Sequence, residues 1–243
     1  MAVSVDAVYQ KVLAILNKEQ RGYVTPQEFN LFANQAQSDL FEQYFYDINQ
    51  FGRVPGNSTE YSDMLTLLNE KINIFENTLA PTRLGLYFIP PSDLYKLGSV
   101  VYKNTTTDSF GTSSTESVEA ERINANEFLY INASPLTKPK NVRPVFVSNS
   151  SGIRVYGDGE VTAVAKIEIQ YIKKPVKVEW NYQMVFGEAL YNSSSSVDFE
   201  LHPSEEVELV IKILELSGIL IKDLNLYQVM NQEEQETIQQ EKA

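Results

Sequence analysis

The spacing of apolar residues changes twice along this chain of 243 residues, and the change limits the folds that the chain can adopt. Up to about residue 80 the apolar residues recur at helical spacing, whereas beyond Ala80-Pro81 short apolar runs alternate with turn residues, as in strands. After residue 201 the helical spacing returns. The sequence therefore predicts an α+β fold in which residues 1–80 and 202–243 form one helical bundle layer. Residues 81–201 are expected to form a central antiparallel insertion, either a small sheet or a barrel.

The predicted helices have clear start and end signals. Thr25-Pro26-Gln27-Glu28 combines a hydroxyl N-cap, proline at the first helical position and a glutamate that completes a capping box, so a long helix is expected from here to about residue 49. A shorter helix precedes it, and another covers about 60–75. The last helix is apolar nearly all round, which predicts a place in the middle of the helical layer, and Gly218 is its expected C-cap.

Two of these helices carry a second apolar face. Phe41 and Phe45 lie off the main stripe of the long helix, and Leu67 and Ile74 lie off that of the next one. A solvated bundle helix needs only one apolar face, so a crowded internal bundle and an interface between subunits both explain the pattern. If the second faces encode assembly, Phe41→Asp should prevent self-association and leave a folded monomer.

The middle of the chain predicts short strands and exposed loops. Strands are expected at 84–89, 97–102, 145–149, 153–156 and 164–172. Residues 118–132 fit a helix or a strand. The stretch 104–117 is rich in Asn, Thr and Ser and has little to bury, which predicts an exposed, mobile loop, with a docking arm as the alternative.

The residues that enzymes and metal sites need are scarce. The chain has no cysteine, which excludes disulfides, thiolate nucleophiles and cysteine-ligated metals, and it has one histidine. That histidine, His202, stands at a helix start, where a capping role is favoured over a catalytic one. The sequence contains no glycine-rich phosphate loop and no hydrolase nucleophile motif. We therefore expect no catalytic residue, no metal ligand and no cofactor.

The charge of the chain limits its partners. A net charge of −12 disfavours a protein that binds nucleic acid by neutralising phosphates, but an acidic surface suits a channel past which DNA slides without sticking. The sequence begins without the basic and apolar regions of a signal peptide, and it has no apolar run of about 18 residues. We expect no membrane partner and assembly in a cytoplasm.

One combination of residues in the last third of the chain resembles a known family. It consists of Gln170-Tyr171-Ile172-Lys173-Lys174-Pro175, a strand ended by proline, then the single Trp180, then Asp198-Phe199-Glu200-Leu201 before a glutamate-rich helix start. This combination resembles the neck proteins of tailed phages, namely the head-to-tail adaptors or ring proteins of short-tailed, crAss-like phages, similar to tail-tubular-type adaptors. The resemblance extends from Thr25 to Gly218.

The resemblance implies a non-enzymatic structural protein of the virion, located in the neck or tail and assembled in the host cytoplasm. It implies a ring of twelve copies that binds the portal protein, continues the DNA channel without binding the genomic DNA specifically, and presents a platform to the adjacent tail or ring protein. The alternative is a receptor- or glycan-binding module of a phage or bacterial surface, suggested by the tyrosine-rich strands and polar loops. An enzyme ranks third.

The second apolar faces of the helices and the resemblance to neck proteins together give the candidate contacts with other copies or partners. They are Phe41, Phe45, Lys173, Lys174, Trp180, Leu224 and Leu226. The lysine pair either protects a sheet edge or meets an acidic neighbouring subunit. Trp180 is either a core residue or an aromatic anchor. From residue 224 the chain is polar with few apolar residues, and it resembles in placement the arms that adaptors lay against the portal, with Leu224 and Leu226 as its anchors.

Overall fold

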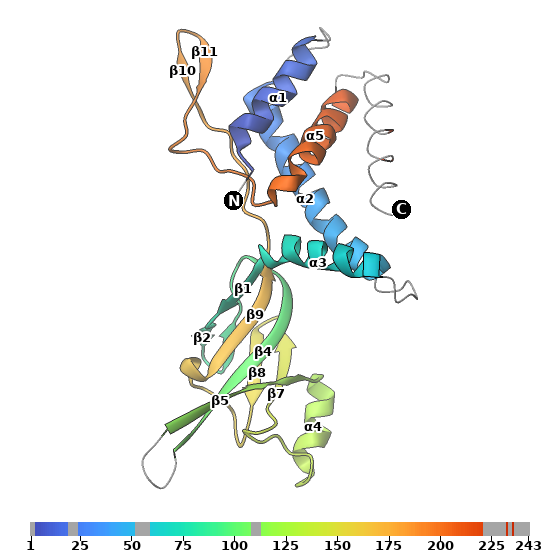
Figure 1. Ribbon diagram of the computed structural model, residues 1–243. Helices are drawn as coiled ribbons and strands as arrows, with labels where there is room; N and C mark the ends of the chain where they lie inside the picture. Colours follow the sequence, from blue (N-terminus) through green and yellow to red (C-terminus); the bar gives the residue numbers. More distant parts are fainter. Residues whose placement is uncertain are drawn as a thin grey trace. The chain divides into compact units, whose positions relative to one another are not determined.

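The computed structural model confirms the α+β class. It describes residues 3–18, 24–51, 59–107 and 113–220, together with residues 232 and 235. The chain divides into two compact units: a helical unit, Met1–Ile74 with Pro175–Ala243, and a β unit, Phe75–Lys174. Figure 1 shows this division by colour, since the helical unit contains the blue start and the orange end of the described chain.

The helical unit contains four α-helices, one 3-10 helix and a β-hairpin among the elements of the described residues. They are α1 (Val5–Lys18), α2 (Pro26–Phe51), α3 (Thr59–Asn73), β10 (Tyr182–Val185), β11 (Glu188–Tyr191), the short 3-10 helix η2 (Pro203–Glu205) and α5 (Glu206–Leu220). The predicted start of the long helix is confirmed at α2. Its capping box is complete, because the Glu28 carboxylate accepts the Thr25 N–H at 2.9 Å while the Glu28 N–H donates to the Thr25 hydroxyl at 3.3 Å. The Thr25 hydroxyl also donates to the Glu28 carboxylate at 2.7 Å. This bond, and after it the bond from the Thr25 N–H, favours the charged carboxylate and lowers the pKa of Glu28.

Helices α1, α2 and α5 bury their apolar stripes. Buried side chains include Val8, Val12 and Leu16 of α1, Phe29, Ala33 and Leu40 of α2, and Leu209, Ile213 and Leu214 of α5. The prediction for α5 is only partly right. Leu209 and Ile213 are fully buried, but Val207 is 67% exposed, so one side of this helix is open. Gly218 lies inside α5 and not beyond its end, so the predicted C-cap is wrong.

An extended segment, residues 176–180, is held on α2 by side-chain amides, while its Glu179 pairs with the backbone of Val197. Three amides bond to every second residue of the segment: Asn30 to Trp180, Asn34 to Val178 and Gln37 to Val176. The Asn34 amide, for example, accepts the Val178 N–H at 2.9 Å and donates to its carbonyl at 2.8 Å. Residues 30, 34 and 37 share one helix face, and alternate residues of an extended chain share one side, so the two periods match. We call these contacts the amide ladder.

The boundaries of the two units differ from those expected. The β insertion was expected to span residues 81–201, but the helical unit resumes at Pro175 and the first boundary follows Ile74. The amide ladder is the physical reason for the later boundary, because it attaches the chain to α2 directly after β9. The chain then pairs with its own N-terminal residues: the Phe199 N–H donates to the Val3 carbonyl at 3.1 Å.

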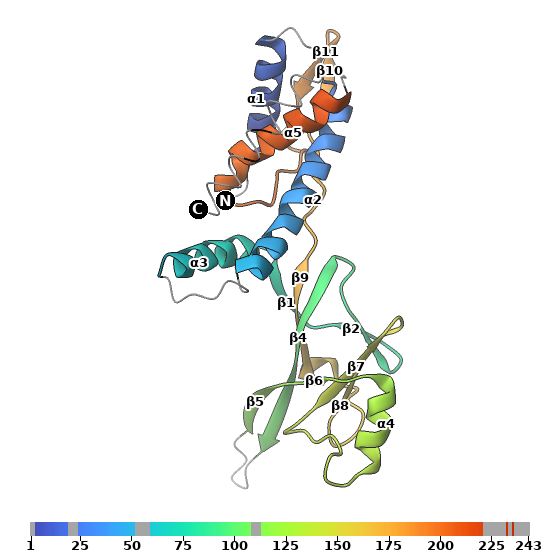
Figure 2. The same ribbon diagram turned by 90° about the vertical axis from the view of Figure 1, so that its right-hand side faces the viewer.

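Within its described residues the β unit consists of two sheets, one short α-helix and one 3-10 helix. Its elements are β1 (Glu76–Leu79), β2 (Thr82–Leu84), β3 (Tyr87–Ile89), β4 (Leu94–Thr107), β5 (Ser113–Glu119), β6 (Glu121–Arg122), α4 (Ala125–Ala133), β7 (Val145–Asn149), β8 (Gly152–Tyr156), the 3-10 helix η1 (Val164–Lys166) and β9 (Ile167–Lys173). The strand orders are β1-β9-β4-β5 and β2-β3-β8-β7-β6, antiparallel throughout except for β6 with β7. Figure 2 shows both sheets from the side.

One glycine is required where β4 bends against β9. The pairing register shifts between Leu97 and Val100, and a Cβ atom on Gly98 would lie 2.9 Å from the Gln170 carbonyl oxygen. Only glycine lets the two backbones approach this closely. The side chains of Val100, Tyr102 and Ile169 then enter the core of the unit.

The polar stretch 104–117 is not the loop that its composition predicted. β4 continues to Thr107 and pairs with β5 in an unbroken antiparallel register, from Val101 opposite Glu119 to Thr107 opposite Ser113. The backbone ladder supports this ribbon without burial, and threonine suits strands, as in the pair Thr105–Thr115, whose hydroxyls lie 3.3 Å apart. Residues 108–112 lie outside the described residues.

The amide ladder predicts a measurable loss of stability. Asn34→Ala removes both bonds to Val178 and leaves a part-buried N–H and C=O unpaired, so the free energy of unfolding should fall by about 1–3 kcal/mol. Gln35→Ala is the matched control, since Gln35 is exposed and its amide donates to Asp39 of the same helix at 2.8 Å. Chemical denaturation measures both. Equal stabilities of the two variants would show that the ladder does not stabilise the fold.

Candidate functional site

An apolar groove lies between α1 and α5 of the helical unit. It has a volume of about 390 Å³. Its lining consists of Ala14 and Ile15 from α1 and of Val207, Val210, Ile211 and Leu214 from α5, with Lys11 and Glu206 beside them. Lys11 and Glu206 form an ion pair of 2.6 Å that joins the two helices. The groove is therefore an apolar surface with a charged edge, and we call it the α1–α5 groove.

The β10–β11 hairpin carries a second exposed apolar surface. Val185 pairs with Glu188, so the loop between the strands has two residues, Phe186 and Gly187. The side chains of Met184, Val185, Phe186 and Leu190 are exposed, that of Phe186 completely. These four residues form the hairpin tip. Figure 1 shows the hairpin extending from the helical unit.

The base of this hairpin is fixed by the core. The Trp180 ring stacks on Tyr182 and on Tyr191, each with ring centroids 5.7 Å apart. It also contacts Tyr9 of α1, with ring centroids 4.4 Å apart. The Trp180 indole N–H donates to the Asp6 carboxylate at 3.0 Å. Trp180 is buried, so it is the core tryptophan of the two alternatives and not an anchor for a partner.

Phe41 is also a core residue. Its side chain is only 3% exposed and contacts the half-buried Phe45 ring edge-on, with centroids 5.1 Å apart. The expectation that Phe41 contacts another subunit is therefore corrected: helical spacing placed it off the main stripe, but α2 is covered on more than one side. In contrast, Leu67 of the second α3 face is exposed, as is Leu31 of α2.

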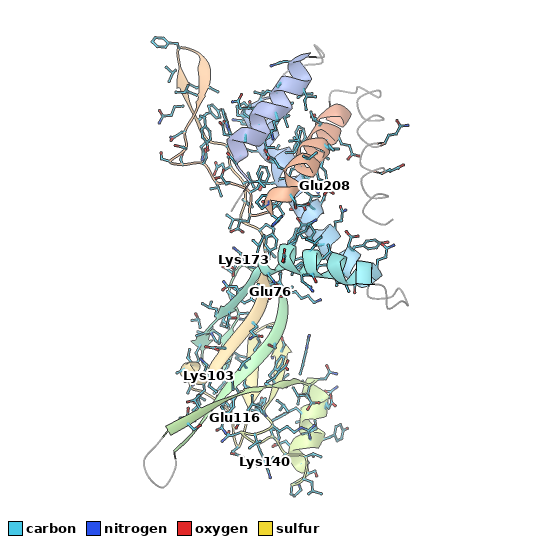
Figure 3. All side chains as sticks on the ribbon, in the orientation of Figure 1. Glu76, Lys103, Glu116, Lys140, Lys173 and Glu208 are labelled. Atoms are coloured by element: carbon cyan, nitrogen blue, oxygen red, sulfur yellow. The ribbon has the colours of Figure 1, made fainter. Side chains whose placement is uncertain are left out.

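The lysine pair ends a central strand. β9 lies between β1 and β4, so the interpretation of Lys173 and Lys174 as edge residues is wrong. The Lys173 N–H donates to the Phe75 carbonyl at 2.9 Å, and the Lys174 N–H donates to the Asp93 carbonyl at 2.7 Å. Figure 3 labels Lys173 and Glu76 at the same end of the paired strands β9 and β1. A contact of the two lysines with a neighbouring subunit stays a prediction.

Leu224 and Leu226, the proposed anchors of the C-terminal segment, lie outside the described residues. Their role stays a prediction.

His202 has the capping role favoured by its position. Its Nδ1 accepts the Ser204 N–H at 3.3 Å at the start of η2. The Ser204 hydroxyl donates to Glu205, whose carboxylate is buried and forms a 2.7 Å ion pair with Lys71 of α3. These groups thus join the start of α5 to α3.

The β unit has a more polar hollow. Its volume is about 360 Å³, and its lining includes Ser99, Glu119, Arg122 and Phe146. Phe146 is buried, so the lining offers no exposed ring to a ligand. Across the described parts of the chain, no group of three or more acidic or histidine side chains is arranged to hold a metal ion. None of the helices in those parts is long and apolar enough to cross a membrane.

No family model matches the chain, and no curated protein is significantly similar to it in sequence. The α1–α5 groove and the hairpin tip are therefore identified by geometry alone. Sequence reasoning missed both. Phe186-Gly187 lacks the Asn-Gly or Asp-Gly signature of a two-residue hairpin loop. Val207 and Ile211 on the open side of α5 are of the same apolar residue types as its buried side chains, so the sequence does not distinguish them.

The burial of Phe41 changes the expected effect of its replacement. Phe41→Ala should lower the free energy of unfolding by about 3–5 kcal/mol, because it leaves a cavity in the helical unit. Leu31→Ala on the same helix is the control, since a side chain that is 71% exposed should change stability by no more than about 0.5 kcal/mol. Thermal or chemical unfolding compares the two. A Phe41 variant that is fully stable but cannot assemble would restore the interface interpretation.

Proposed function

We propose that this protein is a non-enzymatic structural component of a phage particle. It forms a ring in the neck or tail that connects the portal to the adjacent tail or ring protein and continues the DNA channel. The observation that carries the proposal is the pair of exposed apolar surfaces on the helical unit, the α1–α5 groove and the hairpin tip. The resemblance of residues 170–206 to neck adaptors supplies the class of assembly.

Exposed apolar surface of this kind favours an assembling protein over an enzyme. Water in contact with an apolar groove and with a fully exposed phenylalanine is displaced favourably when a partner covers them. A monomeric protein gains nothing from keeping them open. A subunit that binds copies of itself above a portal needs such surfaces on its helical part.

The acidic charge of the chain fits the proposed channel. A net charge of −12 repels phosphates, so a ring of such subunits would let DNA pass without holding it. Under this proposal the protein is located in the virion and is assembled in the host cytoplasm.

A receptor- or glycan-binding module is the second candidate, and the polar hollow of the β unit is the observation in its favour. Glycan sites commonly combine polar groups with an exposed aromatic face. Since Phe146 is buried there, the hollow supports this candidate less than the apolar surfaces support assembly.

Particle location and mass test the proposal. We expect the protein in purified virions, at the neck in electron micrographs of particles, and the isolated protein should elute as a large ring whose mass light scattering gives as a multiple of 27.6 kDa. A protein that is absent from particles, stays monomeric and shifts in mobility with glycans would instead be a binding module.

DNA affinity gives a separate test. Because the chain carries −12 charges, duplex DNA should not bind measurably near physiological ionic strength. Fluorescence anisotropy with a labelled duplex measures this, and the salt dependence is the control. Binding that weakens steeply with added salt would reveal a basic DNA-binding surface and contradict the sliding channel.

A further inference from the structure

We propose that the hairpin tip of one copy inserts into the α1–α5 groove of a second copy, and that this contact repeats around the ring. The inference rests on the proposed function and names the contact through which the copies assemble. It requires a convex and a concave apolar surface that cannot meet within one chain. The helical unit has both.

The two surfaces lie on different sides of the same unit. Figure 1 shows α1 between the hairpin and α5, and Figure 2, which views the molecule from the α5 side, shows the hairpin behind the helices. The tip of a copy therefore points away from its own groove. Because two different surfaces meet, the contact is heterologous, and such a contact either closes a ring or extends into a filament.

The backbone at Phe186 supports a role in binding. Phe186 has φ 52° and Gly187 has φ 91°, and positive φ at both loop residues is the pattern of a type I′ turn, which favours Asn-Gly. A bulky aromatic residue with positive φ is conformationally unfavourable. Phe186 is also fully exposed, so it offsets none of that cost through burial in its own chain. A partner that covers the ring explains why phenylalanine occupies this position.

The size of the contact favours a closed ring over a dimer. An aromatic side chain buries about 150–250 Å², so the tip covers on the order of a few hundred Å². A stable pair needs about 800 Å² from each partner. In a ring every copy makes two such contacts, one through its tip and one through its groove. Assembly should therefore be cooperative, and dimers should be scarce.

A substitution at the tip separates assembly from folding. Phe186→Asn removes the apolar ring but creates the favoured Asn-Gly loop, so the thermal midpoint should stay the same or rise. At a concentration at which the unaltered protein elutes as a ring, this variant should elute as a monomer. Leu136→Asn is the matched control, since Leu136 is 94% exposed on the β unit and its variant should assemble normally.

Engineered cysteines identify the surfaces that meet. The chain has no cysteine, so every disulfide in a variant joins introduced residues. Val185→Cys combined with Val207→Cys places one thiol at the tip and one in the groove. Mild oxidation of the full-length protein should then give a ladder of trimers and larger species on a denaturing gel. Either single variant can give nothing beyond a dimer.

Three outcomes would overturn this inference. They are Phe186→Asn protein that still forms rings, a double-cysteine variant that stops at the dimer or closes within one chain, and a tip thiol that cross-links to another virion protein. If the unaltered protein forms rings in the first two cases, the proposed function stands and only the contact is wrong. If the unaltered protein is monomeric and absent from particles, the proposed function itself fails.

Discussion

The amide ladder on α2 is the interaction on which the arrangement of the helical unit depends. After β9 the segment 176–180 pairs with another backbone at Glu179, which bonds to Val197 in both directions. The carbonyl of Val176 and the backbone groups of Val178 and Trp180 are instead paired by Gln37, Asn34 and Asn30. Three side-chain amides thus pair backbone groups that a neighbouring strand would otherwise pair. The ladder ends at Trp180, so it also sets the point at which the indole enters the core against Tyr9.

The position of the hairpin follows from this anchoring. Trp180 stacks on Tyr182 and Tyr191 at the base of the two strands, and the Asn181 N–H donates to the Ser196 hydroxyl at 3.0 Å. The base is therefore held in place while the tip stays exposed. A surface that is ordered before it binds loses little conformational freedom on docking, which favours a small contact such as the one proposed.

The features that the sequence predicts correctly are those that depend on interactions between residues close together in the chain. The capping box at Thr25 and Glu28 joins residues three apart, so the sequence alone identifies it. The 104–117 stretch shows the opposite case: its composition predicted a loop, but pairing of β4 with β5 forms a ribbon from the same residues. The ladder had a visible signal, amides at helical spacing within α2, yet their partners are about 140–150 residues away.

By itself the sequence determined the order of helical and β parts, the helix starts, the acidic charge and the lack of cysteine chemistry, since these depend on composition and near neighbours. Only the tertiary structure decided which apolar side chains are covered. Phe41 is buried whereas Val207 and Phe186 are exposed, although all three are apolar. The physical reason is that periodicity defines the faces of a helix or strand, whereas burial depends on the distant segment that packs on each face.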